Sequence, residues 1–157
     1  MRSRIQGVVL PSEVGDFADE VRRVFLELGR TFGAEALTGE CSPAIDVYET
    51  DDAIEIVVDL PGVDRGAVRV LLKGDAVLIA GEKTARKARS ESSFHLVERG
   101  FGRFARTVRL ARPCDGQRAR ATLVGGELRV RLPKIADRRG RSLQIPIDAP
   151  QSGSAAH

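Results

Sequence analysis

Tryptophan is absent from this sequence of 157 residues, and cysteine and tyrosine are scarce, with two Cys and one Tyr. The two cysteines, Cys41 and Cys114, lie far apart and form no CxxC pair. A chain long enough to bury a sizeable core does not need a disulfide in order to fold. We therefore expect a single domain with free thiols, in a reducing compartment.

Long apolar runs are also missing. The apolar run at 8–10 is far too short for the core of a signal peptide. No stretch approaches the roughly 20 apolar residues that span a membrane. The sequence therefore predicts a cytoplasmic protein without stable membrane insertion.

Charge of one sign is not concentrated in the chain either. The 25 Lys and Arg are interspersed with 22 Asp and Glu, and the net charge at pH 7 is +3. A field that attracts nucleic acid needs a clustered excess of cations. Two short basic stretches, KTARKAR at 83–89 and RRGR at 138–141, lack the interleaved aromatics that stack on bases. They are typical of a solvated loop and a solvated linker, and we expect no nucleic-acid partner.

Residue types for catalysis or metal binding are few. The only histidines are His95 and His157, and neither lies near a cysteine or an acidic cluster with metal-ligand spacing. This disfavours a zinc site, a Cys-His pair and a Ser-His-Asp triad. The glycines of GFGRF at 100–104 span too few residues to cradle a phosphate, and they lead into a strand-like segment. The pattern predicts a binding protein rather than an enzyme, with no cofactor and no metal.

The first 41 residues form an arm that contains one amphipathic segment. From residue 12 to residue 32 the apolar residues recur at steps of three and four, which places them on one stripe of a helix. These residues are Val14, Phe17, Val21, Val24, Phe25, Leu28 and Phe32. The arm offers no second element to cover this stripe. We expect it to pack on the following domain, on another subunit or on a client protein.

From residue 43 to residue 134 the apolar period changes to two, which is the period of a half-buried strand. Turn signals such as Pro61-Gly62 and Gly125-Gly126 separate the strand-like segments. These segments are 43–49, 53–60, 68–73, 76–82, 104–110, 118–124 and 127–132. Their number and spacing predict an all-β, immunoglobulin-like antiparallel sandwich over residues 42–135.

Two features interrupt the strand pattern. The connection between the strands that end near Glu82 and begin near Phe104 is too long for a hairpin, and such loops usually have a function. It contains Phe94 and Leu96 within SSFHLVERG, a segment that suits a short strand pairing outside its own sandwich. The second feature is Arg106, a charge on an apolar strand face. Such a charge needs a carboxylate partner or a route to water.

The last segment, 136–157, is an extension rich in Arg, Ser, Gly and Ala, a composition that does not bury itself. Ile145-Pro146-Ile147 is the exception. Pro146 fixes its own φ and biases Ile145 toward an extended conformation, so the two isoleucines project as a pre-shaped pair. Such a segment suits docking at a sheet edge or in a groove.

Four segments together resemble one known family. They are PAIDVYETDDAIEIVVDLPGV, ERGFGRFARTVRL, ATLVGGELRVRLPK and IPI. In that order they are similar to the start of an α-crystallin domain, its arginine-bearing strand, its A-x-x-x-n-G-x-L signature and the I-x-I anchor of the small heat shock proteins. The resemblance covers roughly residues 43–147, and the long loop is similar to that of the bacterial and plant type. The sequence departs from the pattern at Gly125, where asparagine is usual, and at LARPCDG, where Leu-Pro is usual.

The resemblance implies a function and four sets of site residues. Its members are ATP-independent holdases that keep partly unfolded client proteins soluble, and they assemble as homo-oligomers built from dimers. In this chain it implies a loop that crosses to a neighbouring subunit, with Arg106 paired to Glu98 at that interface. The expected residues are Ile145, Pro146 and Ile147 for the tail anchor, Val70, Leu72 and Leu123 for its groove, Phe94, Leu96, Glu98 and Arg106 for the dimer, and Phe17, Val21, Phe25 and Leu28 for clients.

Three other interpretations remain open. A monomeric co-chaperone-like β-sandwich leaves the tail motif and the long loop unexplained. An extracellular adhesive sandwich is disfavoured by the unpaired cysteines and by the lack of a signal segment. A thiol-dependent enzyme acting through Cys114 is the weakest alternative, since a small residue at a strand end accounts for this cysteine. Native mass separates the first alternative, a monomer, from a chaperone of many subunits.

Overall fold

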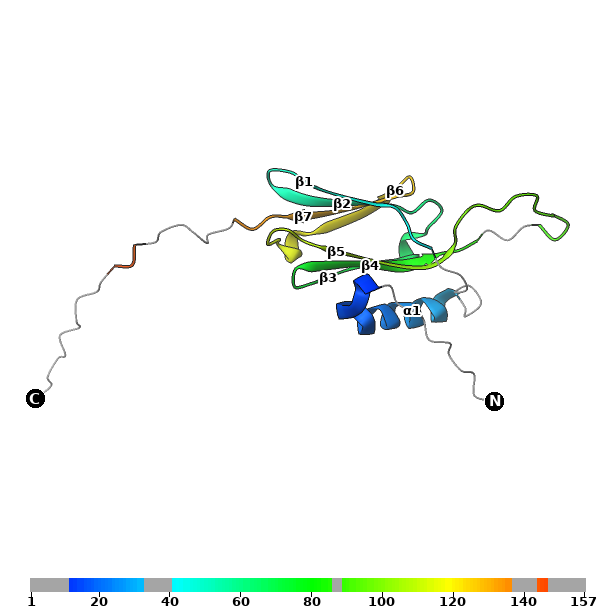
Figure 1. The fold of residues 1–157 in the computed structure, drawn as a ribbon, viewed down its shortest axis with the longest axis horizontal. Helices are drawn as coiled ribbons and strands as arrows, with labels where there is room; N and C mark the ends of the chain where they lie inside the picture. The colour runs from blue at the N-terminus through cyan, green and yellow to red at the C-terminus, as the bar shows by residue number, and fades with distance from the viewer. Residues whose placement is uncertain (1–11, 33–40, 86–88, 137–143, 147–157) are drawn as a thin grey trace, which may run out of the picture.

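The computed structural model describes residues 12–32, 41–85, 89–136 and 144–146. Its body is a sandwich of two antiparallel sheets, and one helix lies against the outer face of the second sheet (Figure 1). The predicted fold class, an antiparallel β-sandwich preceded by a helix, is confirmed. No helix within the described ranges is long and apolar enough to cross a bilayer.

The two sheets contain four and three strands. The larger sheet has the order β1-β2-β7-β6 and the smaller one the order β3-β4-β5. Neighbouring strands pair antiparallel throughout. The strands are β1 (Ile45–Glu49), β2 (Ala53–Asp59), β3 (Val68–Lys73), β4 (Ala76–Lys83), β5 (Gly102–Arg109), β6 (Arg120–Val124) and β7 (Glu127–Pro133).

The main core lies between the two sheets. Its buried side chains are Ile54, Ile56, Val58, Leu60, Val68, Val77, Ile79, Phe104, Val108, Leu110, Leu128, Val130 and Leu132. They come from alternate positions of each strand, because successive side chains point to opposite faces of a sheet. One face of each sheet therefore builds the core, and the other face is left for a different contact.

The β6–β7 hairpin turns at Gly125-Gly126, where φ is 60° and 80°. Both values lie in the left-handed region, which glycine adopts without steric cost. A Cβ on Gly126 would also lie 2.9 Å from the Cα of Pro61. Glycine at position 125, where the resemblance leads one to expect asparagine, therefore suits this turn.

Strand β6 begins at Arg120 rather than at Arg118, where the sequence pattern placed its start. Gly116–Arg118 forms a 3-10 helix instead. The Asp115 side chain caps it by accepting hydrogen bonds from two backbone N–H groups of this turn. Cys114 then makes an isolated bridge with Lys134. These contacts set the register of the LARPCDG connection.

Helix α1 (Ala18–Phe32) follows a 3-10 helix over Ser12–Phe17 and packs on the outer face of β3-β4-β5 (Figure 1). Five apolar side chains of this region are buried there: Phe17, Val21, Val24, Phe25 and Leu28. They meet Ala76, Leu78, Ala80 and Ala105, with Leu71 at the margin. The sequence left three possible partners open for this stripe. In the structure the stripe packs on the β-sandwich of the same chain.

Candidate functional site

A groove opens where β3 and β6, the last strands of the two different sheets, approach each other. Its volume is about 490 Å³. Its lining consists of Arg65, Val68, Arg69, Val70, Ala121, Thr122, Leu123, Val124 and Leu128. Aliphatic side chains form most of this surface, and two arginines lie on its β3 side. The groove therefore suits a short apolar segment.

The sequence placed three residues in this groove, and the structure brings two of them to it. Val70 and Leu123 both contribute to the lining. Leu72 is 37% exposed and lies outside the groove. It packs against Gly116 instead, because a Cβ added to Gly116 would lie 2.7 Å from Leu72 Cδ2. The reason is the late start of β6, because the 3-10 helix, and not a strand, stands beside Leu72.

Both strands that flank the groove are edge strands. An edge strand presents backbone N–H and C=O groups without a sheet neighbour on one side, and extended segments bind by adding to it. The expected anchor is available for this contact. Ile145 is 83% exposed and Pro146 is exposed as well, whereas Ile147 lies outside the described residues.

The long loop projects from the end of the sandwich between β4 and β5 (Figure 1). Phe94 and Leu96 are 69% and 73% exposed, and Val97 is exposed too. The described part of the loop contains no strand in the single chain. An apolar segment of this kind needs a second surface to cover it.

A free strand edge that suits this segment lies at β1. Strand β1 ends the four-stranded sheet, and its side chains Val47 and Tyr48 are exposed. Edge strands with exposed apolar side chains are adhesive unless a neighbour covers them. The loop and the β1 edge therefore make a complementary pair of surfaces within one chain.

Arg106 lies on the core side of β5, opposite Ile79 of β4 in the register. Its guanidinium donates a hydrogen bond of 2.7 Å from Nη1 to the carbonyl oxygen of Pro43. This contact ties β5 to the segment that leads into β1. Glu98 is exposed in the loop, and its pairing with Arg106 of another subunit stays a prediction.

Replacing Arg106 by alanine is expected to reduce the free energy of unfolding by about 1.5–3 kcal/mol, the typical worth of a hydrogen bond made by a charged group. Arg109→Ala is the matched control, because Arg109 is mostly exposed and its ion pairs with Asp16 and Asp75 contribute little. Urea denaturation with constant slope measures both changes. Equal losses in the two variants would contradict the role given to Arg106.

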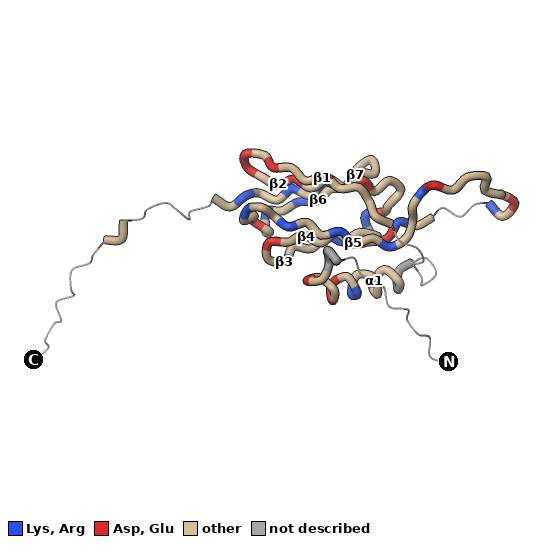
Figure 2. The backbone as a smooth tube through the Cα atoms, viewed as in Figure 1, with Lys and Arg blue, Asp and Glu red and all other residues tan. Residues whose placement is uncertain are grey.

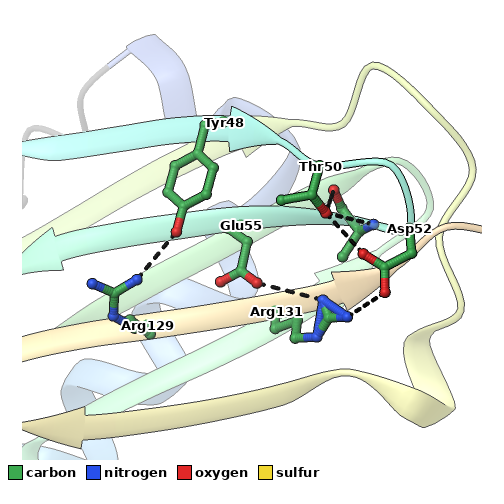
Figure 3. Close-up of polar contacts among 7 residues, drawn as sticks. Tyr48, Thr50, Asp52, Glu55, Arg129 and Arg131 are labelled. Atoms are coloured by element: carbon green, nitrogen blue, oxygen red, sulfur yellow. Dashed lines mark hydrogen bonds and ion pairs between the residues drawn. The ribbon is translucent and has the colours of Figure 1, made fainter.

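The outer face of the four-stranded sheet is polar. Figure 3 shows Arg131 between two carboxylates, 2.6 Å from Asp52 Oδ2 and 3.4 Å from Glu55 Oε1, and Arg129 donating to the Tyr48 hydroxyl. A hydrogen bond from the Thr50 hydroxyl, together with the nearby Arg131, holds the pKa of Asp52 below its ordinary value. The charged residues of β1 and β2 are acidic, and those of β6 and β7 are arginines apart from Glu127 (Figure 2). This face is therefore suited to water rather than to apolar clients.

The four residues expected to bind clients are all buried between the helical segment and the sheet. Phe17, Val21, Phe25 and Leu28 face the β3-β4-β5 sheet and are not on the surface of the described chain. Among the α1 residues whose side chains the structure describes, Leu26 on the opposite side of the helix is the only exposed large apolar residue. Client binding through this stripe would require the helix to leave the sheet.

Sequence reasoning missed a buried carboxylate under the same helix. Glu82 of β4 is 1% exposed, and it lies opposite Arg103 of β5 in the register. Burial raises the pKa of the Glu82 carboxyl, and the Arg103 charge opposes this shift only in part. Alternation places Glu82 on the same strand face as Leu78 and Ala80, but the sequence does not say that α1 covers this face. Among the residues that the structure describes, no group of three or more His, Cys, Asp or Glu side chains could hold a metal ion.

The two sheets, the interrupted β4–β5 connection and the edge groove define an α-crystallin type of sandwich. Residues 46–148 match the model of the Hsp20/alpha crystallin family. The chain belongs to this family, whose members are known as small heat shock chaperones.

Relatives from bacteria and yeast agree with this assignment. Spore protein SP21 of Stigmatella aurantiaca is 37% identical over 103 residues, which are 66% of this chain and 61% of that protein. Heat shock protein 16 of Schizosaccharomyces pombe is 36% identical over 101 residues, 63% of this chain and 71% of that protein.

Solved structures agree as well. The structure of heat shock protein 16.0 from Schizosaccharomyces pombe superposes with a TM-score of 0.58 at 33% identity, covering 69% of this chain and 99% of that one. A small heat-shock protein from Xylella fastidiosa superposes with a TM-score of 0.59 at 26% identity, covering 68% and 98%.

Proposed function

We propose that this protein is an ATP-independent holdase, a chaperone that binds partly unfolded proteins and keeps them from aggregating without refolding them. It acts as a homo-oligomer built from dimers, without an enzymatic step and without a cofactor. Its partners are client proteins and further copies of itself, not nucleic acid or a membrane interior. Its two unpaired cysteines fit a cytoplasmic location.

The observation that carries this proposal is the pairing of unsatisfied surfaces within one chain. The groove between β3 and β6 is apolar, and Ile145 of the tail is exposed. The loop bears exposed apolar side chains, and β1 presents a free edge. Within the described part of a single chain the groove and the tail do not cover each other, and neither do the loop and the β1 edge. Association of several copies allows the tail of one copy to cover the groove of another and the loop of one copy to cover the β1 edge of another.

The two contacts differ in symmetry. Exchange of the loop between two copies is reciprocal and closes a dimer, because each copy supplies one loop and one β1 edge. Docking of a tail in a groove joins different surfaces, so it continues from dimer to dimer and builds larger assemblies. Burying two isoleucines is worth about 3–6 kcal/mol before ordering costs, enough to dock and weak enough to exchange.

A heat-labile enzyme, incubated above its melting temperature with and without this protein, tests the proposed activity. We expect the purified chain to suppress light scattering by the client without added nucleotide, and to form soluble complexes that elute with the client. Adding ATP should leave the suppression unchanged. Scattering that is not reduced at equimolar subunits, or that falls only with ATP, would refute an ATP-independent holdase.

A further inference from the structure

The outer face of β3-β4-β5, which α1 covers, holds polar groups that the helix does not satisfy. Both carboxylate oxygens of Glu82 are buried and have no hydrogen-bond partner in the part of the chain that the structure describes. The same holds for Arg103 Nε and for Thr107 Oγ1. A buried polar group without a partner costs free energy that water would restore. This contact is therefore less stable than its apolar stripe alone suggests.

The strand neighbour of Glu82 contacts the middle of α1. Arg103, opposite Glu82 in the register, is stacked on Phe25 with its guanidinium carbon 5.0 Å from the ring centroid. Phe25 is one of the buried residues of the helix stripe. Moving α1 away would uncover Phe25 and admit water to the Glu82–Arg103 pair.

Three ion pairs at the rim of this contact join the helical segment to the sheet. Lys73 binds Glu20 at 2.9 Å, Arg69 binds Glu27 at 3.2 Å and Arg109 binds Asp16 at 2.9 Å. In each pair the acid belongs to the helical segment and the base to the sheet. These pairs are largely exposed, so they orient the helix without holding it strongly. Glu82 is the only carboxylate beneath the helix among the buried residues described.

We propose that α1 is a pH-dependent latch, in which ionisation of Glu82 loosens the helix and its departure uncovers two apolar surfaces for clients. One surface is the helix stripe of Phe17, Val21 and Phe25, and the other is the sheet face around Leu78. The client part of this inference rests on the proposed holdase function. The latch itself does not, because docking of α1 is measured without any client.

The direction of the pH effect follows from the burial of Glu82. Its pKa is raised above the ordinary 4.5 while α1 is docked, and exposure to water brings it back. At a pH between these two pKa values, docking of α1 is therefore accompanied by uptake of a proton by Glu82. The docked state is favoured fully below the ordinary pKa, and that advantage is lost as pH rises through the raised one.

The ion pairs of the rim change the stability of α1 docking in the opposite direction, and they do so at lower pH. The hydrogen bond from Lys73 holds the pKa of Glu20 below 4.5, so its contribution to docking is lost only as pH falls through that lowered value. The two effects act on different sides of the ordinary carboxyl pKa. A loosening of α1 as pH rises above the ordinary carboxyl pKa is therefore the effect expected of Glu82 and not of Glu20.

The experiment uses the full chain with Phe25→Trp, because the sequence has no other tryptophan. We expect the emission to move to longer wavelength as pH rises from about 5 to about 8, and the docking equilibrium constant to fall about tenfold for each unit by which the docked pKa is raised. The titration should not depend on protein concentration, because the latch lies within one subunit. Hydrogen exchange of α1 amides in the parent chain, expressed as protection factors, provides a second readout without the reporter.

Glu82→Gln in the same background should flatten this titration, because the amide stays neutral at every pH. Glu55→Gln is the control, because Glu55 and its partner Arg131 both belong to the four-stranded sheet that α1 does not cover, and it should keep the parent response. A flat parent titration, an unchanged response in Glu82→Gln, or a strong dependence on concentration would overturn the latch. If the titration behaves as expected but clients still aggregate, the latch stands and the holdase function fails.

Discussion

Replacing both Ile145 and Ile147 by alanine is expected to reduce the native mass of this protein from a large oligomer to a dimer. The double substitution removes most of the apolar area that, in the proposed assembly, joins one dimer to the next. Losing about 3–6 kcal/mol per tail contact corresponds to a weakening of roughly 10²–10⁴-fold. Light scattering after size exclusion measures the mass. Circular dichroism should keep its β-type spectrum, because Ile145 is exposed and not part of either core.

Two further variants serve as controls for this experiment. Gln144→Ala should leave the mass unchanged, since an exposed polar side chain contributes little to a dry groove. Leu123→Arg places a charge in the lining of the groove. It should lower the native mass as the double alanine variant does, because it alters the groove rather than the tail. A double alanine variant that assembles like the parent would mean that another surface joins the dimers.

The β-sandwich was predictable because its strands obey a simple rule. Ile54, Ile56 and Val58 recur at every second position of the sequence, and all three are buried in the core. Turn glycines at the β6–β7 hairpin marked where the chain reverses. Val70 and Leu123 were expected near this groove from the family resemblance and not from alternation, and both contribute to its lining.

The features that the sequence could not predict depend on contacts between distant segments. Leu72 has the right period for the groove, but the local turn of Gly116–Arg118 decides what stands beside it. The amphipathic period of α1 predicts a buried stripe without saying which surface covers it. Glu82 appears as an ordinary strand glutamate until α1 is placed above it. Each of these outcomes is decided by tertiary packing rather than by local pattern.

Replacing residues 84–101 by an Asn-Gly turn is expected to convert the dimer into a monomer. The register makes this design possible, because Lys83 and Gly102 already face each other at the ends of β4 and β5. A two-residue turn of this type closes an antiparallel pair directly. The variant loses Phe94 and Leu96, the exposed apolar side chains that we expect to cover the β1 edge of a neighbour.

This test requires the Ile145→Ala, Ile147→Ala background, in which tails no longer hold subunits together. The native mass should fall by half relative to that background, while thermal unfolding stays cooperative because the inter-sheet core is untouched. Phe94→Ser with Leu96→Ser in the full-length loop is the matched control, and it should weaken the dimer without shortening the chain. If the hairpin variant still forms dimers, the two-fold contact lies elsewhere. The edge of β5, the last strand of the smaller sheet, where the Cys41 N–H donates to the Arg103 carbonyl oxygen, would then be the surface to test next.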